Sequence, residues 1–318
     1  MTLYPWQEKS WSSLAQDKSK MHHAYIFVGA FGAGLYRYSN TFAQSLICSN
    51  LTDTNLPCGK CQDCHLLMTQ HPNLKIIDNS AEDSTSKNIS IESIRGLKRF
   101  FELSSHKIDG NKVILINNAE SLTLNAANAL LKLLEEPPEN SYIILTTQNI
   151  SSLLPTIVSR CSIVTCPKPT KDEAKKFLNL NGYEHLSSQL NLFNNLPLDL
   201  IDKQDDLSLY ETIINEFEKG KNLELMKIDS KWFSADFPSI INLFQKWLYD
   251  IFLFKLTKQF QFFENKKENI KKLSDAADIS KLVKLVMNVY QVKSISDKPI
   301  NKDIAFDNLM IEYKNIFK

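Results

Sequence analysis

The fold is decided by residues 113–146, VILINNAESLTLNAANALLKLLEEPPENSYIILT. This segment begins and ends with short apolar runs, Val113–Ile116 and Tyr142–Thr146, which predict two buried strands. Between the runs, apolar side chains recur with a period of 3.6 residues, which predicts a helix that ends at Pro137 and Pro138. The apolar positions of this helix are Leu122, Ala126, Ala129, Leu130, Leu133 and Leu134. A strand, a helix and a second strand in this order are typical of a parallel sheet.

The same alternation continues toward the N-terminus. Ala24–Val28 and Leu74–Asp78 predict two more short strands, and residues 38–47 predict a helix. A further helix opens at the Ser90 cap and carries one apolar face. That face consists of Ile91, Ile94, Leu97 and Phe101. We therefore expect an α/β domain whose parallel sheet is covered by helices on both faces.

Strand signals fade after Cys166, and the rest of the chain reads as helices. A length of 318 residues favours more than one domain. We expect three: an α/β domain at 1–166, a small helical domain at 167–207 and an all-α domain at 208–318.

Composition limits the possible partners and location. The 43% hydrophobic and 23% charged residues are ordinary for a soluble globular protein, and no apolar run is long enough to cross a membrane. The N-terminus lacks the basic and apolar blocks of a signal peptide, so we expect a cytoplasmic protein without membrane contact. A net charge of +1 means that any nucleic-acid contact has to come from a local patch or from an assembly. The charge run at 266–272 is interpreted as a solvated helix face.

Four of the six cysteines are closely spaced in the sequence: Cys48, Cys58, Cys61 and Cys64. Disulfides do not normally persist in a cytoplasmic chain, so this cluster predicts a metal site. Zn²⁺ accepts four thiolates in a tetrahedron, and a closed set of four would make the zinc structural rather than catalytic. An iron–sulfur cluster and a group of free buried thiols are the two competing interpretations.

A glycine-rich loop follows the first predicted strand. Its spacing, from Gly29 to Gly34, is that of a phosphate-binding loop. Leu35 and Tyr36 stand where such a loop carries a lysine and a serine or threonine. The loop alone is therefore ambiguous between a nucleotide site, the remnant of one and a simple turn.

Four segments together resemble the bacterial clamp-loader subunits of DNA polymerase III, which are AAA+ proteins. The segments are residues 91–95 (IESIR), 112–120 (KVILINNAE), 125–138 (NAANALLKLLEEPP) and 154–161 (LPTIVSRC). The four-cysteine module after the phosphate-loop helix is also a feature of this family. The resemblance is dense over about residues 20–166 and thin beyond, although residues 299–310 look like the final helix of the family's C-terminal collar.

The resemblance implies an AAA+ domain, a helical lid and a collar that joins a ring. The family contains an ATP-hydrolysing gamma or tau type and a delta-prime type that commonly does not hydrolyse ATP. Leu35 and Tyr36 supply neither a cation nor a small metal-binding hydroxyl, and Asn117 and Asn118 stand where the Walker B carboxylates would be. The lid arginine of active relatives is also missing, because no arginine follows Arg160 and the matching segment is residues 195–199. We expect no functional ATP site.

The element Ser159-Arg160-Cys161 is intact. The resemblance implies that Arg160 serves as an arginine finger for the ATP of a neighbouring subunit, with Ser159 and Cys161 as its motif context. A guanidinium suits this role because it is a permanently charged, rigid fork. The competing interpretation makes Arg160 an ordinary surface charge.

The expected function is a delta-prime-like, non-catalytic subunit of the DNA-directed DNA polymerase III holoenzyme that helps to load the sliding clamp onto primed DNA. Expected partners are gamma/tau and delta subunits in a ring, with the clamp and primer-template DNA reached through that assembly. Two alternatives stay open: an active gamma/tau-like ATPase, and an independent zinc-dependent DNA-binding protein. The near-neutral charge argues against the second of these.

Overall fold

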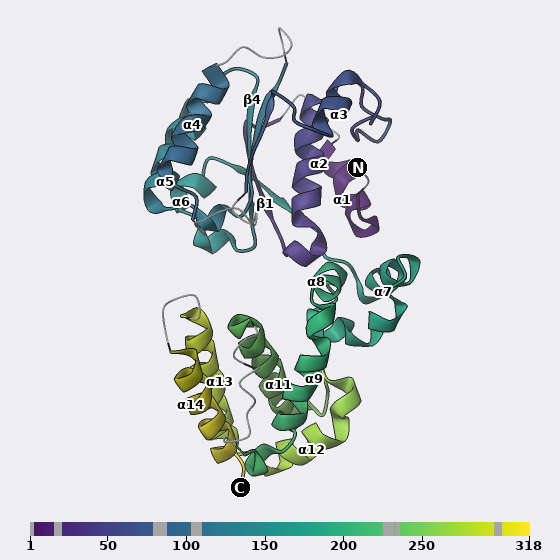
Figure 1. Ribbon diagram of the computed structural model, residues 1–318, viewed down its shortest axis with the longest axis vertical. Coiled ribbons are helices and arrows are strands. Elements are labelled where there is room, and N and C mark those ends of the chain that lie inside the picture. The colour runs from purple at the N-terminus through teal and green to yellow at the C-terminus, as the bar shows by residue number, and fades with distance from the viewer. Residues whose placement is uncertain are drawn as a thin grey trace. The chain divides into compact units, whose positions relative to one another are not determined.

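The computed structural model describes residues 3–15, 21–78, 88–102, 110–224, 232, 236–295 and 301–318. The chain forms two compact units (Figure 1). One comprises Met1–Phe177 and Leu196–Asp199, and the other comprises Leu178–Asn195 and Leu200–Lys318. The expected division into three domains is finer than this and stays a prediction.

The first unit is built on a five-stranded parallel sheet of order β2-β3-β4-β1-β5. The strands are β1 (Ala24–Val28), β2 (Leu74–Ile77), β3 (Lys112–Ile116), β4 (Ser141–Thr147) and β5 (Ser162–Thr165). This architecture confirms the expected α/β class with a parallel sheet. Four strands lie where the sequence predicted them, and the edge strand β5 was not predicted.

Helices cover both faces of the sheet, as expected (Figure 1). On one side lie α4 (Ile91–Glu102), α5 (Leu124–Glu135) and α6 (Pro155–Val158); on the other lie α1 (Glu8–Ala15), α2 (Leu35–Ile47) and α3 (Gln62–Leu67). Alternate residues of β3 explain the two layers. Ile114 and Ile116 pack in the cluster that contains the apolar faces of α4 and α5, whereas Val113 and Leu115 pack in the cluster that contains α2.

The short 3-10 helices of this unit are η1 (Pro5–Gln7), η3 (Phe31–Ala33), η4 (Ala119–Ser121) and η5 (Ile150–Ser152). The helix α7 (Lys171–Leu180) begins in the first unit and ends in the second, as does α8 (Pro197–Asp202). The α5 helix starts at a threonine cap, because Thr123 Oγ1 accepts a hydrogen bond of 3.2 Å from Ala126 N.

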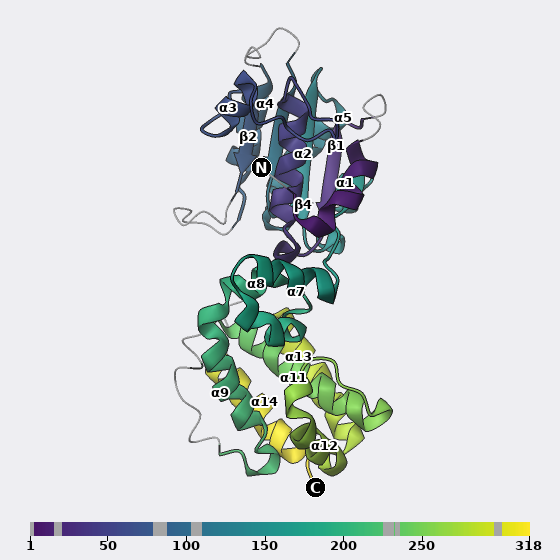
Figure 2. The same ribbon diagram turned by 90° about the vertical axis from the view of Figure 1, so that its right-hand side faces the viewer.

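The second unit is entirely helical in its described part (Figure 2). Its longer helices are α9 (Leu207–Phe217), α11 (Phe237–Thr257), α12 (Lys267–Ala276), α13 (Ile279–Ser294) and α14 (Lys302–Asn315). Its 3-10 segments are η6 (Glu184–Phe193), η7 (Gln204–Asp206), η8 (Gly220–Asn222) and η10 (Glu264–Lys266). Of the collar-like stretch 299–310, residues 299 and 300 lie outside the described residues.

A buried aromatic core joins the helices of the second unit. Trp247 Nε1 donates to Tyr313 Oη at 2.8 Å, and that hydroxyl donates to Phe217 O at 2.7 Å. Phe244 packs against both Phe217 and Tyr313. The indole N–H of Trp247 and the hydroxyl of Tyr313 thus have hydrogen-bond partners inside an apolar core.

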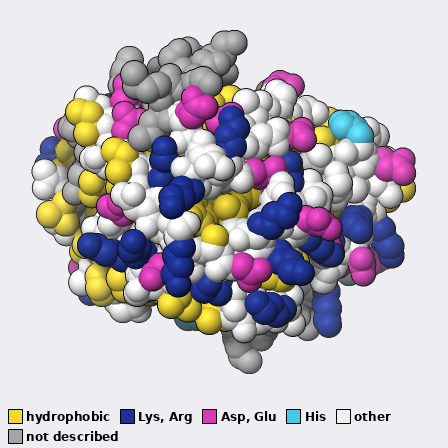
Figure 3. All heavy atoms as spheres, turned by 90° about the horizontal axis from the view of Figure 1, so that it is seen from below, with side chains coloured by type: hydrophobic (Ala, Val, Ile, Leu, Met, Phe, Trp, Pro, Cys, Tyr) yellow, Lys and Arg dark blue, Asp and Glu magenta, His cyan; other side chains and the backbone are white. Residues whose placement is uncertain are grey.

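In the run at 266–272, Lys266 ends η10 and residues 267–272 form the start of α12, with Ile270 buried and Lys271 and Lys272 exposed. The face seen from below in Figure 3 carries Lys and Arg side chains interspersed with carboxylates and hydrophobic groups. The exposure of Lys271 and Lys272 agrees with the interpretation of the run as a solvated helix face. Among the described helices, none has both the length and the apolar content needed to cross a membrane.

Candidate functional site

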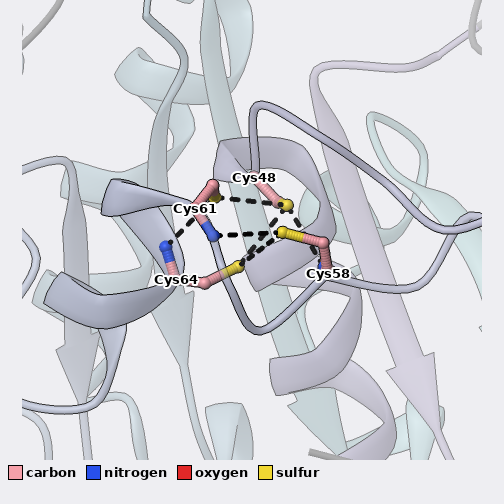
Figure 4. Close-up of side chains that lie close together, drawn as sticks. All are labelled: Cys48, Cys58, Cys61 and Cys64. Atoms are coloured by element: carbon pink, nitrogen blue, oxygen red, sulfur yellow. Dashed lines mark hydrogen bonds between the residues drawn. The ribbon is translucent and has the colours of Figure 1, made fainter.

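The four clustered cysteines converge on one point (Figure 4). Cys48 caps the C-terminus of α2, while Cys58, Cys61 and Cys64 come from the following loop and the start of α3. All four Sγ atoms lie within 4.8 Å of one another. Cys48 Sγ is 3.5 Å from Cys64 Sγ and 3.8 Å from Cys61 Sγ, close to the edge of about 3.8 Å that a tetrahedron with 2.3 Å metal–sulfur bonds requires. The cluster can therefore hold a metal ion.

Backbone amides stabilise negative charge on these sulfurs. Cys61 N donates to Cys58 Sγ at 3.3 Å, and Cys64 N donates to Cys61 Sγ at 3.4 Å. Burial raises the pKa of Cys61, but hydrogen bonds from the Cys64 and Ser49 amides and from the Cys64 and Cys58 side chains together lower that pKa to about 6. Hydrogen bonds from the Lys60 and Cys61 amides likewise lower the pKa of Cys58. Burial raises the pKa of Cys48 and of Cys64. The backbone amides thus favour the thiolate, the form that binds metal, at two of the four positions.

A buried polar group supports the loop beside the cluster. Asp63 lies between Cys61 and Cys64 and accepts a hydrogen bond from Ser49 Oγ. His71 Nε2 lies 3.6 Å from Asp63 Oδ1, and both side chains are buried. His71 Nδ1 accepts from Asn73 N at 3.0 Å, so His71 belongs to this supporting network and not to the group of four close ligands.

The glycine-rich loop joins β1 to α2. Gly29 N donates to Thr147 O at 3.1 Å, and Gly34 has φ +82°, a left-handed conformation that favours glycine. Leu35 is completely buried in the apolar layer between α2 and the sheet, whereas Tyr36 is 38% exposed. The two positions that would carry phosphate and magnesium ligands thus hold a core residue and a surface phenol.

The two asparagines after β3 are engaged with neutral and acidic partners. Asn117 Oδ1 accepts from Thr146 Oγ1 at 2.6 Å, and its Nδ2 donates to Asp78 Oδ2 at 3.1 Å. Asn118 has φ +57°, and its backbone N–H donates to the same Thr146 hydroxyl at 3.0 Å. Burial raises the pKa of Tyr36, and the charge of Asp78 raises it further, so Tyr36 and Asn117 share Asp78 as a neighbour.

Arg160 lies in the turn between α6 and β5. Its Nη2 donates to Glu135 Oε1 at 2.7 Å, and its Nη1 donates to Thr156 O at 3.0 Å. Ser159 Oγ also donates to Thr156 O, at 3.1 Å. Cys161 packs against the apolar core, and burial raises the pKa of its thiol to about 12, so this cysteine is protonated and unreactive at neutral pH. The Arg160 side chain is 36% exposed, which leaves part of it accessible to another molecule.

A basic groove runs between α4 and α5, with a cavity of about 490 Å³. Its lining combines three cations and two amides on an apolar floor. The polar lining residues are Arg95, Lys98, Asn125, Asn128 and Lys132. All five are exposed, so these charges and amides face solvent.

The structure brings together the four predicted cysteines, and it links Tyr36 and Asn117 through Asp78. Arg160 lies apart from these two groups and donates hydrogen bonds to Glu135 and to the Thr156 carbonyl. Sequence reasoning singled out neither Glu135 nor Gln7, whose buried side chain donates to the carbonyls of Ala33 and Gly34 in the glycine loop. Glu135 lies within residues 125–138, one of the segments that carry the family resemblance, so that segment could have pointed to it. No sequence feature pointed to Gln7.

Comparison with known proteins gives consistent matches. Residues 6–170 match the model of a protein family described as "DNA polymerase III, delta subunit". The chain is 30% identical over 265 residues to DNA polymerase III subunit delta' of Pseudomonas aeruginosa, covering 80% of this chain and 79% of that one. It is 34% identical over 179 residues to the subunit of the same name from Haemophilus influenzae, covering 55% and 53%. Among solved structures, a DNA polymerase III gamma subunit-related protein from Thermotoga maritima is 19% identical, with a TM-score of 0.44 and coverage of 98% and 99%.

Proposed function

The chain belongs to the delta-prime subunit family of DNA polymerase III, and on that basis we propose that it is a non-hydrolysing clamp-loader subunit that supplies an arginine finger to a neighbouring ATPase subunit. In this role it helps to place the sliding clamp on primed DNA. Its partners are gamma/tau and delta subunits in a ring, with the 208–318 region as collar and 167–207 as lid. A replication subunit of this kind works in the cytoplasm.

The observation that best supports the proposal is that Arg160 is held by hydrogen bonds and is still partly exposed. The side chain has a fixed direction, because Glu135 and the Thr156 carbonyl hold two of its nitrogens, and it is still partly exposed. The hydrogen bonds of the Arg160 guanidinium go to Thr156, Ser159 and Glu135. A guanidinium held in this way is suited to a phosphate supplied by another subunit.

The chain's own loop lacks the groups that hydrolysis requires. Leu35 is buried, so its position offers no cation to a β- or γ-phosphate. Asn117 and Asn118 offer amides where magnesium needs carboxylates, and Asn117 already bonds to Thr146 and Asp78. These features support a subunit that does not turn over ATP.

Zinc is the metal that best suits Cys48, Cys58, Cys61 and Cys64. A set of four thiolates leaves no open position for water, which supports a structural role. Cys48 lies at the end of α2, Cys58 lies in the next loop, and Cys61 and Cys64 lie at the start of α3, so a bound Zn²⁺ would fasten the loop 49–60 to the domain.

The basic groove between α4 and α5 is the part of the described surface that we assign to primer-template DNA within the assembly. Arg95 and Lys98 face it from α4, and Lys132 faces it from α5. Three cations contribute modest affinity, so the isolated chain should bind DNA weakly. The assembly would add the contacts of the other subunits.

The test is reconstitution with the gamma/tau and delta subunits. The chain alone should show no magnesium-dependent ATP hydrolysis, and the complete loader should show hydrolysis that depends on Arg160. Turnover by the purified chain would support the gamma/tau-like alternative instead. Salt-sensitive, tight DNA binding without partners would support an independent DNA-binding protein.

A further inference from the structure

Asp63 is a buried carboxylate inside the cysteine module, residues 48–64. It lies between Cys61 and Cys64, in the first turn of α3, and is 2% exposed. Burying a carboxylate is unfavourable unless other groups compensate its charge. The dipole of a six-residue helix favours an acid in its first turn but offsets only a small part of this cost. Asp63 therefore depends on specific partners, and these partners link the cysteines to the sheet.

One partner is Ser49, the residue directly after the first cysteine of the module. Its hydroxyl donates to Asp63 Oδ2, and its backbone amide donates to Cys61 Sγ. Ser49 thus contacts the carboxylate through its side chain and a cysteine sulfur through its backbone. Because the bond to Asp63 restricts the conformation of Ser49, it also fixes the direction of the amide that meets Cys61.

The other partner is His71, which faces the second carboxylate oxygen. His71 Nε2 lies 3.6 Å from Asp63 Oδ1, and His71 is 4% exposed. Its Nδ1 accepts from Asn73 N at 3.0 Å, which places the hydrogen of the neutral ring on Nε2. The positive edge of the ring therefore faces the carboxylate, in an electrostatic contact that is longer than a hydrogen bond.

The backbone around His71 is attached to the sheet. Leu74 N, at the start of β2, donates to His71 O at 3.1 Å, and Val113 N of β3 donates to Asn73 O at 2.8 Å. The carboxylate is therefore supported from the sheet on one side, and it holds Ser49 on the other. A continuous set of contacts runs from the sheet to a sulfur of the cysteine cluster.

We propose that Asp63 is a positioning residue for the metal, because it holds the Ser49 amide on Cys61 Sγ. His71 keeps the carboxylate itself in place. Asp63 acts on the ion through Cys61 and is not one of the four close ligands. This role rests on the proposed zinc site. Polar groups that orient metal ligands typically contribute about 10–100-fold to metal affinity.

Competition with a chromophoric chelator tests the role of Asp63 on the purified full chain loaded with Zn²⁺. Asp63→Ala should bind Zn²⁺ about 10–100-fold more weakly than the wild type. Asp63→Asn should lose less, because its amide oxygen can still accept from Ser49. Ser49→Ala changes an exposed residue and should weaken binding roughly tenfold, which keeps the test decisive if Asp63→Ala does not fold. Asp53→Asn is the matched control, an exposed acid of the loop 49–60, and should bind like the wild type.

Thermal melts with Zn²⁺ and with a chelator separate positioning of the metal site from general support of the fold. A residue that acts through the site lowers the Tm of the Zn²⁺-loaded chain more than that of the metal-free chain, because the stabilisation by bound metal depends on its affinity. Wild-type affinity in Asp63→Ala and Ser49→Ala, with equal Tm shifts in both states, would overturn the positioning role and leave the zinc site intact. A wild-type chain that binds no metal would overturn both.

Discussion

Arg160 Nη2 donates to Glu135 Oε1 at 2.7 Å, which joins the turn after α6 to the last residue of α5. The two side chains are 36% and 50% exposed. Partly exposed ion pairs of this kind contribute at most about 1 kcal/mol to stability, because solvent screens them. The pair therefore matters more for the direction of the guanidinium than for the folding of the chain.

Replacing Arg160 tests its role in the assembled loader. Arg160→Ala should lower hydrolysis at the neighbouring ATP site by roughly 10³-fold, as removal of an arginine finger does in GTPases, while total ATPase falls less because the other sites persist. Glu135→Gln should give a smaller loss, because the finger keeps its charge but is less well directed. Steady-state ATPase with clamp and primed DNA is the measurement.

The control for these variants is Arg99→Ala, which removes an exposed arginine from α4 and should leave the ATPase unchanged. Assembly must also be intact, which size-exclusion chromatography of the reconstituted ring can show. If Arg160→Ala assembled normally and hydrolysed ATP at the wild-type rate, the finger role would be lost. If Glu135→Gln matched the wild type, Glu135 would have no part in directing the guanidinium.

Metal removal should destabilise the first unit. We expect one zinc per purified chain, and we expect Cys61→Ser to lose it, because three thiolates bind Zn²⁺ much more weakly than four. The loss should cost roughly 2 kcal/mol or more, which corresponds to about 4 °C or more in Tm. Metal analysis and a thermal melt with and without a chelator measure both effects.

His65→Ala is the matched control for the metal site. His65 is exposed on α3, next to Cys64, and lies outside the group of four close sulfurs. Its replacement should leave the zinc content at one. Iron with visible absorbance would indicate an iron–sulfur cluster instead. A purified chain that contains no metal, and whose stability a chelator does not change, would support the interpretation of the four cysteines as free buried thiols.

The cap of α7 gives a pH-dependent prediction. Thr170 N and Oγ1 both donate to Glu173 Oε2, at 2.8 and 2.7 Å, and these bonds hold the pKa of Glu173 below its ordinary value. A lowered native pKa means that the contribution is complete above the ordinary pKa of Glu and is lost as the pH falls through the native value. The wild type should therefore be more stable than Glu173→Gln at pH 7, and the two should converge in acid.

Urea unfolding across this pH range measures the difference. Thr170→Ala, which removes the capping hydroxyl, should cost about 1 kcal/mol at neutral pH. Asp172→Asn is the control, because Asp172 is an exposed acid in the same turn. A constant gap between wild type and Glu173→Gln down to low pH would contradict the assigned cause.

Most of the sheet follows from local pattern. β1, β3 and β4 are short apolar runs buried on both faces, so their sequences alone predict central strands. β5 was missed because Ser162–Thr165 contains only two apolar residues and is half-exposed. It becomes a strand through pairing with β1, a contact that no local sequence feature encodes.

Clustered ligands were easier to predict than single partners. Cys48, Cys58, Cys61 and Cys64 are close in sequence, so their spacing already implied a shared site. Gln7 and Asp199 approach the glycine loop from distant parts of the chain. Glu135, at the end of α5, contacts Arg160 in the turn between α6 and β5. Such contacts depend on tertiary packing, which composition and periodicity do not specify.

The groove between α4 and α5 predicts how salt affects DNA binding by the assembled loader. Each cation that neutralises a phosphate makes the negative slope of log K against log [salt] steeper by about 0.9. Lys98→Ala and Lys132→Ala should therefore each make that slope shallower by roughly one. The affinity for different primer-template sequences should fall equally, since the groove offers charges rather than base readers. Lys271→Ala, an exposed lysine of α12, is the control and should change neither quantity. Unchanged slopes in both groove variants would remove the groove from the DNA-binding surface and leave DNA contact to other subunits.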